Sequence, residues 1–373
     1  ALGLHPLHLA GAIYLQEPSA SAPVDILDVQ PGDCVLDLCA APGSKSTQIL
    51  RENPGFLVCN ELDPQRAGVL LSNLERSGAV NFALSRDDAR KTARRFPEAF
   101  DKVLVDAPCS GEGMIKKHSA ALQEWSAAGV RSCAARQAQI LDAACEALAP
   151  GGTMVYSTCT YAREENEDQV RAFLDRHPEM EQIPIDKPYG RPDFDGAGGL
   201  RIFPMDGGEG QFAAKLRKKG KPQKTRRLPQ EQPVRLTALE QAFLDGHGIR
   251  FDWYYRKNGQ LFGMNHPFVK GNWKRQGVLI GETVKNRFEP AHACFMAVES
   301  SRQADLTDDQ LEAFMHGLER PVKTDKGFVQ VTWQGLPVGF GKSTGPVLKN
   351  RLPKGLRLLE GSHVKFTDQQ KAG

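Results

Sequence analysis

Two of the eight cysteines, Cys109 and Cys159, have surroundings in which a thiol can act as a nucleophile. Cys109 lies in the segment DAPCSGEG and Cys159 in the segment STCTY, and each follows an apolar run in a loop that contains Gly, Ser or Thr. Asp106, three residues before Cys109, places an acid near that thiol and favours it as the attacking group. A cysteine outside such a loop usually packs as a small hydrophobic side chain. We interpret five others in this way: Cys34, Cys59, Cys133, Cys145 and Cys294.

The segment DLCAAPGSKS (37–46) has the features of a nucleotide-binding loop. Its small residues Ala40, Ala41 and Gly43 allow the backbone to approach a ligand closely. Backbone amides at the start of the helix that follows can hold a carboxylate, such as that of methionine. The segment is neither a GxGxxG motif nor a Walker A motif. The loop alone therefore does not specify which nucleotide it binds.

Acidic residues follow the next two apolar runs, where a nucleoside requires them. Glu61 lies about 20 residues after the loop, which is where a carboxylate binds a ribose diol. Asp87 and Asp88 follow the third run, where a contact with adenine or ribose is expected. Asp63 precedes a proline and is better explained as a helix cap. Each acid alone would be a helix cap, but the loop and the acids in this order favour a nucleoside cofactor.

A thiolate, an acid and a methyl-donating nucleoside together suit the methylation of carbon 5 of cytosine. Carbon 5 is a poor nucleophile, but a thiolate that adds to carbon 6 makes it enamine-like and able to attack a sulfonium methyl group. Asp106 would protonate ring nitrogen 3 or donate a hydrogen bond to it, and burial would have to raise its pKa for this. Lys45 could lower a thiol pKa or orient Asp106. An ordinary solvated lysine in the first turn of a helix explains Lys45 equally well.

Five apolar runs alternate with helical sequence and would position these residues. They are DCVLDLC (33–39), FLVCN (56–60), NFALS (81–85), DKVLVDA (101–107) and GTMVYSTC (152–159). A long helix over residues 131–149 precedes the last run and is expected to end at Pro150-Gly151-Gly152. This alternation predicts an α/β, Rossmann-like fold with a parallel sheet and helices on both faces. Ligands bind at the carboxyl ends of such strands, so both thiols are expected to face one cleft.

The second half of the chain differs in composition. Residues 215–227 contain eight basic side chains and no acidic one, although the whole chain has a net charge of only +3. Such a segment is either a solvated linker or a contact for a phosphate backbone. From residue 233, an aromatic cluster and short β-like runs predict a small mixed or mainly β domain, or two. No run is long enough for a membrane span, and no CxxC pair suggests a zinc site, so we expect neither membrane nor metal.

Four segments of the first half and one near the C-terminus carry a family resemblance. They are HPLHLAGAIYLQEPSA (5–20), VLDLCAAPGSKS, DAPCSGEGM, YSTCTYAREENE and LPVGFGKSTGPVLKNRLPKGLR. With these segments the chain resembles the Sun/Fmu-type RNA 5-methylcytosine methyltransferases, in particular the RsmF-type ribosomal RNA enzymes. The resemblance spans nearly the whole chain, and the CAAPGSK segment combined with paired PC and TC motifs is highly specific. Two features depart from the family pattern. Glu61 stands where Asp is usual, and most of the family's N-terminal RNA-binding segment before HPLH is expected to be missing.

The resemblance implies a class I methyltransferase that uses S-adenosylmethionine. It implies that Cys159 is the nucleophile, that Cys109 assists breakdown of the covalent adduct, and that Asp106 contacts the target base. It places these residues at the cofactor: Cys39, Ala40, Ala41, Pro42, Gly43, Ser44, Lys45, Glu61, Asp88 and Asp106. The implied substrate is small-subunit ribosomal RNA, naked or assembled, methylated by a cytoplasmic monomer.

The expected division of the chain has four parts. Residues 1–30 lead into the catalytic domain, residues 31–216 form the methyltransferase domain, residues 217–232 are a basic linker, and residues 233–373 form a PUA-like RNA-binding region. Three other functions are less consistent with the sequence. A DNA cytosine-5 methyltransferase would not need Cys159, a non-catalytic RNA-binding factor would not need both cysteines and Asp106, and an amino-methyltransferase would carry an Asn/Asp-Pro-Pro-aromatic motif.

Overall fold

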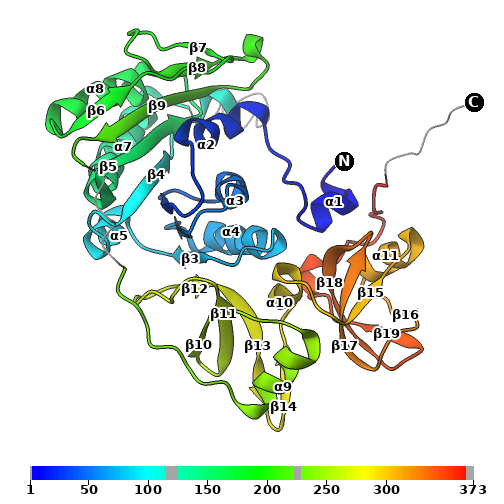
Figure 1. Cartoon of the computed structure of the whole chain (residues 1–373). Coiled ribbons are helices and arrows are strands. Elements are labelled where there is room, and N and C mark those ends of the chain that lie inside the picture. The colour runs from blue at the N-terminus through cyan, green and yellow to red at the C-terminus, as the bar shows by residue number, and fades with distance from the viewer. Residues whose placement is uncertain (1, 115–124, 222–227, 367–373) are drawn as a thin grey trace, which may run out of the picture.

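The computed structural model describes residues 2–114, 125–221 and 228–366 (Figure 1). Parallel strands form the centre of a large sheet in the order β3-β2-β1-β4-β5. These strands are β1 (Cys34–Asp37), β2 (Phe56–Asn60), β3 (Phe82–Ser85), β4 (Phe100–Asp106) and β5 (Leu148–Thr158). They coincide with the five apolar runs of the sequence, so the predicted Rossmann-like order is confirmed.

Helices cover both faces of this sheet, because successive strand residues point to opposite sides. In β1, Val35 packs into one buried cluster and Leu36 into another. The Val35 cluster includes residues of α2 (Ala22–Leu27), α3 (Ser44–Arg51) and α4 (Pro64–Arg76). The Leu36 cluster includes residues of α5 (Ala89–Arg95), α7 (Ala127–Ala147) and α8 (Glu167–Arg176). The sheet is therefore buried on both sides, as its continuous apolar strands require.

The sheet is not wholly parallel, which corrects the sequence-based expectation. Antiparallel strands extend it beyond β5 in the order β9-β8-β7, and β6 also pairs with β9. These strands are β6 (Met180–Ile183), β7 (Arg191–Pro192), β8 (Leu200–Ile202) and β9 (Gln211–Lys218). At the other edge, β12 (Arg275–Gln276) pairs antiparallel with β3. A two-residue strand from the second half of the chain leaves no local pattern by which it could be predicted.

Two predicted boundaries differ from the structure. Helix α7 ends at Ala147, and Pro150 lies within β5 instead of stopping the helix. The pairing of β4 with β5 shifts there, since Phe100 pairs with Leu148 and Lys102 with Thr153, so the proline and glycines form an irregular part of the strand. The basic run also begins inside β9, which continues to Lys218. The division of the chain into four parts stays a prediction.

Two smaller sheets follow, as the composition predicted. The first contains β10 (Trp253–Lys257), β11 (Gln260–Met264), β13 (Val278–Val284) and β14 (Arg287–Pro290), with α9 (Ala238–His247) and α10 (His292–Ala297) beside it. The second contains β15 (Gln303–Asp305), β16 (Arg320–Pro321), β17 (Gly327–Trp333), β18 (Leu336–Ser343) and β19 (Val347–Asn350), with α11 (Asp308–Met315). Helix α10 packs against α4 of the first half (Figure 1).

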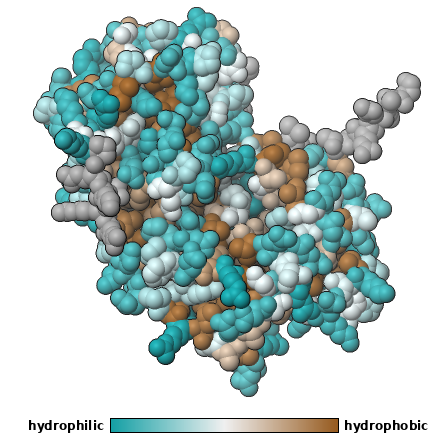
Figure 2. All heavy atoms as spheres, viewed as in Figure 1, coloured by the Kyte–Doolittle hydropathy of each residue, from teal (hydrophilic) through white to brown (hydrophobic). Residues whose placement is uncertain are grey.

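Short helices complete the described structure. They are α1 (Pro6–Leu9) and the 3-10 helices η1 (Leu2–Leu4), η2 (Pro18–Ser21), η3 (Glu112–Met114), η4 (Arg163–Glu165), η5 (Pro204–Asp206) and η6 (Lys354–Leu356). Within the described ranges, no helix is both long and apolar enough to cross a lipid bilayer. Figure 2 shows mainly hydrophilic residues on the visible face, with hydrophobic residues in scattered groups.

Candidate active site

The structure brings the two predicted cysteines into contact. Asp106 at the end of β4 pairs in register with Ser157 near the end of β5, so the loops that follow both strands emerge side by side. The Sγ atoms of Cys109 and Cys159 lie 3.3 Å apart, within the distance of a thiol hydrogen bond. Both side chains are largely but not fully buried. Both thiols therefore lie together at the carboxyl edge of the sheet, as strand order predicts.

The electrostatics of the pair distinguish the two thiols. The hydrogen bond from Cys109 lowers the pKa of Cys159, and the positive charge of Lys45 lowers it further, against burial and the charge of Asp106. The same hydrogen bond and burial raise the pKa of Cys109 well above its ordinary value. The pair therefore favours a thiolate at Cys159 with Cys109 as its proton-bearing partner. Nearness in sequence to Asp106 favoured the opposite assignment.

Asp106 accepts hydrogen bonds from three side chains. Lys45 Nζ lies 2.7 Å from Asp106 Oδ2, while Ser157 Oγ and Gln211 Nε2 lie 2.8 and 3.4 Å from Oδ1. These contacts hold the Lys45 ammonium against the carboxylate. The expected role of Asp106 at nitrogen 3 of the target base stays a prediction.

Lys45 is not the solvated lysine that its place in a first helical turn allowed. It is buried at the start of α3. Burial alone would lower its pKa, but the charge and hydrogen bond of Asp106 outweigh burial and raise it. Asp37, at the end of β1, is also buried, and burial raises its pKa to about 7. Lys45 is thus a charged group held inside the site.

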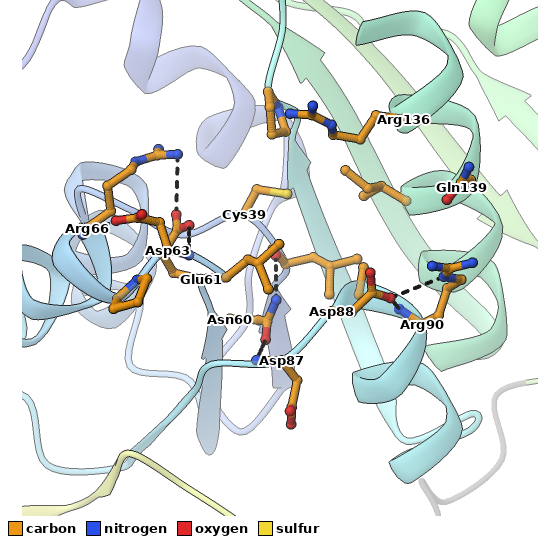
Figure 3. Close-up of a pocket in the computed structure, with 16 residues that line it drawn as sticks. Cys39, Asn60, Glu61, Asp63, Arg66, Asp87, Asp88, Arg90, Arg136 and Gln139 are labelled. Carbon is orange, nitrogen blue, oxygen red and sulfur yellow. Dashed lines mark hydrogen bonds and ion pairs between the residues drawn. The ribbon is translucent and has the colours of Figure 1, made fainter. Parts of the chain in front are cut away.

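A cavity of about 580 Å³ opens at the carboxyl ends of β1, β2 and β3 (Figure 3). Three of the predicted cofactor residues, Cys39, Glu61 and Asp88, line it. Glu61 is buried, and its carboxylate accepts the N–H of Asp63 at 2.9 Å. Asp88 caps α5 by accepting the N–H of Arg90 at 2.9 Å, so it is a helix cap that also faces the cavity.

The remaining predicted cofactor residues are not among those that line the cavity. Ala40, Ala41, Pro42 and Gly43 form the turn between β1 and α3, Ser44 begins α3, and Lys45 follows it. Gly43 has φ +111°, and a Cβ atom there would lie 2.9 Å from a side-chain carbon of Leu70. The turn therefore requires glycine at this position. Asp63 caps α4, as predicted, through a hydrogen bond from the N–H of Arg66.

Sequence reasoning missed several residues of the site. Ser157 had a usable signal, because it precedes Cys159 by two residues and pairing of β4 with β5 places it beside Asp106. Gln211 on β9 and Arg136 and Gln139 on α7 had none, since their contacts depend on packing between distant segments. Three more residues of the cavity lining were also not predicted: Asn60, Leu62 and Ile140.

Two family models match the chain. The model of 16S rRNA methyltransferase RsmB/F matches residues 24–217, and the model of the methyltransferase RsmF PUA domain matches residues 301–358. The chain is 36% identical over 381 residues to ribosomal RNA small subunit methyltransferase F of Klebsiella pneumoniae, and 34% identical over 389 residues to that of an Escherichia coli strain. Each alignment covers 95% of this chain and 80% of the relative.

Solved structures resemble more than half of the chain. The structure of NSun6 from Pyrococcus horikoshii with SFG is 30% identical, with a TM-score of 0.55 over 59% of this chain and 57% of that one. A methyltransferase homologue from Pyrococcus horikoshii is 31% identical, with a TM-score of 0.51 over 58% of this chain and 72% of that one. The chain is therefore an S-adenosylmethionine-dependent methyltransferase that belongs to the RsmB/F family of 16S rRNA methyltransferases.

Proposed function

We propose that this enzyme methylates carbon 5 of a cytosine in 16S ribosomal RNA through a covalent bond between Cys159 and carbon 6. The observation that carries the proposal is the contact between the two thiols, with a lowered pKa at Cys159 and a raised one at Cys109. A family member that modified an exocyclic amine would have no use for a thiolate beside the Lys45–Asp106 pair. The names of the relatives support ribosomal RNA of the small subunit as the substrate.

The residues present fit S-adenosylmethionine, which supplies a methyl group on a sulfonium centre when bound. The buried carboxylate of Glu61 accepts one backbone N–H and pairs with Arg66 at 3.6 Å, and it faces the cavity, where its remaining lone pairs can accept from a ribose diol. Leu62 and Ile140 offer apolar surfaces for an adenine ring, and Asp88 can accept from its amino group. The bound SFG named for the Pyrococcus horikoshii relative supports this use of the cavity.

In the proposed reaction, the Cys159 thiolate attacks carbon 6 of the target cytosine. Lys45, through its hydrogen bond with Asp106, supplies the proton or hydrogen bond that nitrogen 3 needs as negative charge develops there. Carbon 5 then takes the methyl group, and the bond between that methyl group and the sulfonium sulfur breaks. Water takes the proton of carbon 5, whose electron pair re-forms the carbon 5–carbon 6 double bond, and Cys159 leaves as a thiolate. Nitrogen 3 returns its proton to the Lys45–Asp106 pair. Cys109 donates its hydrogen bond to the departing sulfur and so favours release of the product.

The target base must leave any helical stack to reach these thiols, so we expect a flipped or loop cytosine. We propose that the region after residue 233 binds the RNA around it, since residues 301–358 match a PUA domain model. We further propose that the enzyme acts as a monomer in the cytoplasm, where ribosomal RNA is processed.

The decisive experiment supplies methyl-labelled S-adenosylmethionine with naked 16S RNA and, separately, with small subunits. Digestion to nucleosides should then place the label in 5-methylcytosine. Label in 4-methylcytidine or in another nucleoside would reject the proposed chemistry while leaving the family assignment intact. Comparison of the two substrates shows whether assembly is needed for recognition.

A further inference from the structure

Each of the two cysteine loops is held by a carboxylate that belongs to the other loop. Glu112, three residues after Cys109, accepts the Thr160 hydroxyl at 3.0 Å and the Tyr161 N–H at 2.9 Å. Glu165, six residues after Cys159, accepts the Ser110 N–H at 3.1 Å. Thr160 and Tyr161 follow Cys159 directly in sequence, and Ser110 follows Cys109. Glu112 therefore holds the backbone and side chain beside Cys159, and Glu165 holds the backbone beside Cys109.

Further hydrogen bonds complete this connection. Gln137 of α7 donates to Glu165 at 2.7 Å and to the carbonyl of Pro108 at 3.0 Å. The hydroxyls of Ser110 and Thr160 lie 2.8 Å apart. The N–H of Gly113 donates to the carbonyl of Cys159 at 2.9 Å. We call Ser110, Glu112, Gln137, Thr160 and Glu165 the cross-loop clasp.

The cross-loop clasp contains a carboxylate, that of Glu165, in a buried position where a charge is destabilising. Glu165 is fully buried, and within the described residues neither Glu165 nor Glu112 forms an ion pair. A buried carboxylate without a cation is destabilising unless directed donors compensate it. Here the donors are the backbone N–H of Ser110 and the amide of Gln137, whose positions fix the Cys109 loop. The hydrogen bonds that offset the free-energy cost of burying the Glu165 carboxylate are therefore the same ones that fix the position of the Cys109 loop.

We propose that Glu112 and Glu165 are positioning residues that set the separation of the Cys109 and Cys159 sulfurs. The consequence rests on the proposed function, because that separation allows Cys109 to stabilise the attacking thiolate. Within the described residues, neither glutamate forms a hydrogen bond with the sulfur of Cys109 or Cys159, so both act through the loops. If the clasp loosens, the thiol hydrogen bond is lost and the pKa of Cys159 must rise.

The direction in which the pKa of Cys159 changes distinguishes a positioning role of the glutamates from a direct effect of their charge. Replacement of a nearby carboxylate by a neutral amide would, through its charge alone, lower a thiol pKa. Loss of the hydrogen bond from Cys109 raises it instead. The test is the pH profile of iodoacetamide alkylation at Cys159, followed by peptide mass spectrometry on the full chain without RNA.

The variants are Glu165→Gln and Glu112→Gln, and the matched control is Glu164→Gln at an exposed neighbouring glutamate. We expect the alkylation profile of both variants to move upward by about one pH unit, with about tenfold slower alkylation near neutral pH. The control should keep the profile of the unmodified enzyme. Binding of S-adenosylmethionine, measured by calorimetry, shows that each variant is folded.

An unchanged or downward-shifted profile in variants that bind the cofactor would overturn the proposal. If Glu165→Gln fails to fold, the partly exposed Glu112 decides the question alone, with the same expected direction. Because alkylation needs no RNA, its outcome is independent of which nucleoside the enzyme methylates. A failed proposal for the clasp is thus distinguishable from a failed proposal for the reaction.

Discussion

The ammonium of Lys45 lies 2.7 Å from the carboxylate of Asp106, and its charge also acts on the Cys159 thiol. One buried cation thus serves two groups of the site. It lowers the pKa of the thiol that we propose as the nucleophile and holds a proton beside the carboxylate that would face ring nitrogen 3. This shared role makes Lys45 the residue whose loss should affect both binding of the proton and formation of the thiolate.

We expect Lys45→Met to lower the methylation rate by about 100-fold or more, the usual contribution of a positioned proton donor. The pKa of Cys159 should rise, because the cation that lowers it is gone. The pH profile of single-turnover methylation should therefore shift upward. Lys45→Arg keeps the charge and serves as the control. A Lys45→Met enzyme with a reduced rate but an unshifted profile would limit Lys45 to orienting Asp106.

The two cysteines should give opposite phenotypes. Cys159→Ala should abolish methyl transfer and form no covalent complex with RNA, because the attacking sulfur is missing. Cys109→Ala should accumulate a covalent protein–RNA adduct, because the departing Cys159 sulfur loses its hydrogen-bond donor. Denaturing gels of enzyme incubated with RNA and cofactor detect the adduct. Exchanged phenotypes would reverse the assignment of nucleophile and helper.

The central strands could be predicted from sequence because each is a buried apolar run between turn residues. The antiparallel strands beyond β5 could not, since β7, with both residues exposed, and β12 owe their structure to pairing with distant segments. The site followed the same rule. Glu61 and Asp88 could be predicted to line the cavity because they follow β2 and β3, whereas Arg136 is an exposed helix residue whose place at the cavity depends on packing.

The choice between the cysteines shows the limit of local reasoning. Cys109 and Asp106 are three residues apart in sequence, which favoured Cys109. The pairing of β4 with β5 instead places the Lys45 charge near Cys159 and makes Cys109 its hydrogen-bond donor. A contact between residues 50 positions apart lowers the pKa of Cys159 and raises that of Cys109, and no single segment carries that information.

Cofactor affinity should depend on Glu61 and not on its neighbour Asp63. Glu61→Ala removes the buried carboxylate that would accept the ribose hydroxyls, and a hydrogen bond to a charged group contributes about 1.5–3 kcal/mol. The Kd for S-adenosylmethionine, measured by calorimetry, should therefore rise about 10- to 150-fold. Asp63→Asn preserves the cap of α4 and should bind the cofactor normally. Equal affinities for the two variants would remove Glu61 from the cofactor site.

Lys218 tests whether the start of the basic run is structural. Its Nζ donates to the carbonyls of Cys145 and Leu148, at 3.0 and 2.9 Å, and so satisfies backbone groups at the end of α7. Lys218→Met should therefore lower the free energy of unfolding by about 1–3 kcal/mol, the cost of leaving such groups unsatisfied. Urea unfolding measures this loss.

Arg217→Gln is the matched control for Lys218, because its ion pair with Glu181 is solvent-exposed and such pairs contribute about 1 kcal/mol at most. Neither substitution should change the dependence of RNA affinity on salt, since both side chains already have partners in the protein. A phosphate contact would reveal itself differently: each lost contact should reduce the slope of log Kd against log salt by about 0.7–0.9. If Lys218→Met reduced that slope without loss of stability, the beginning of the basic run would belong to the RNA-binding surface and not to the sheet.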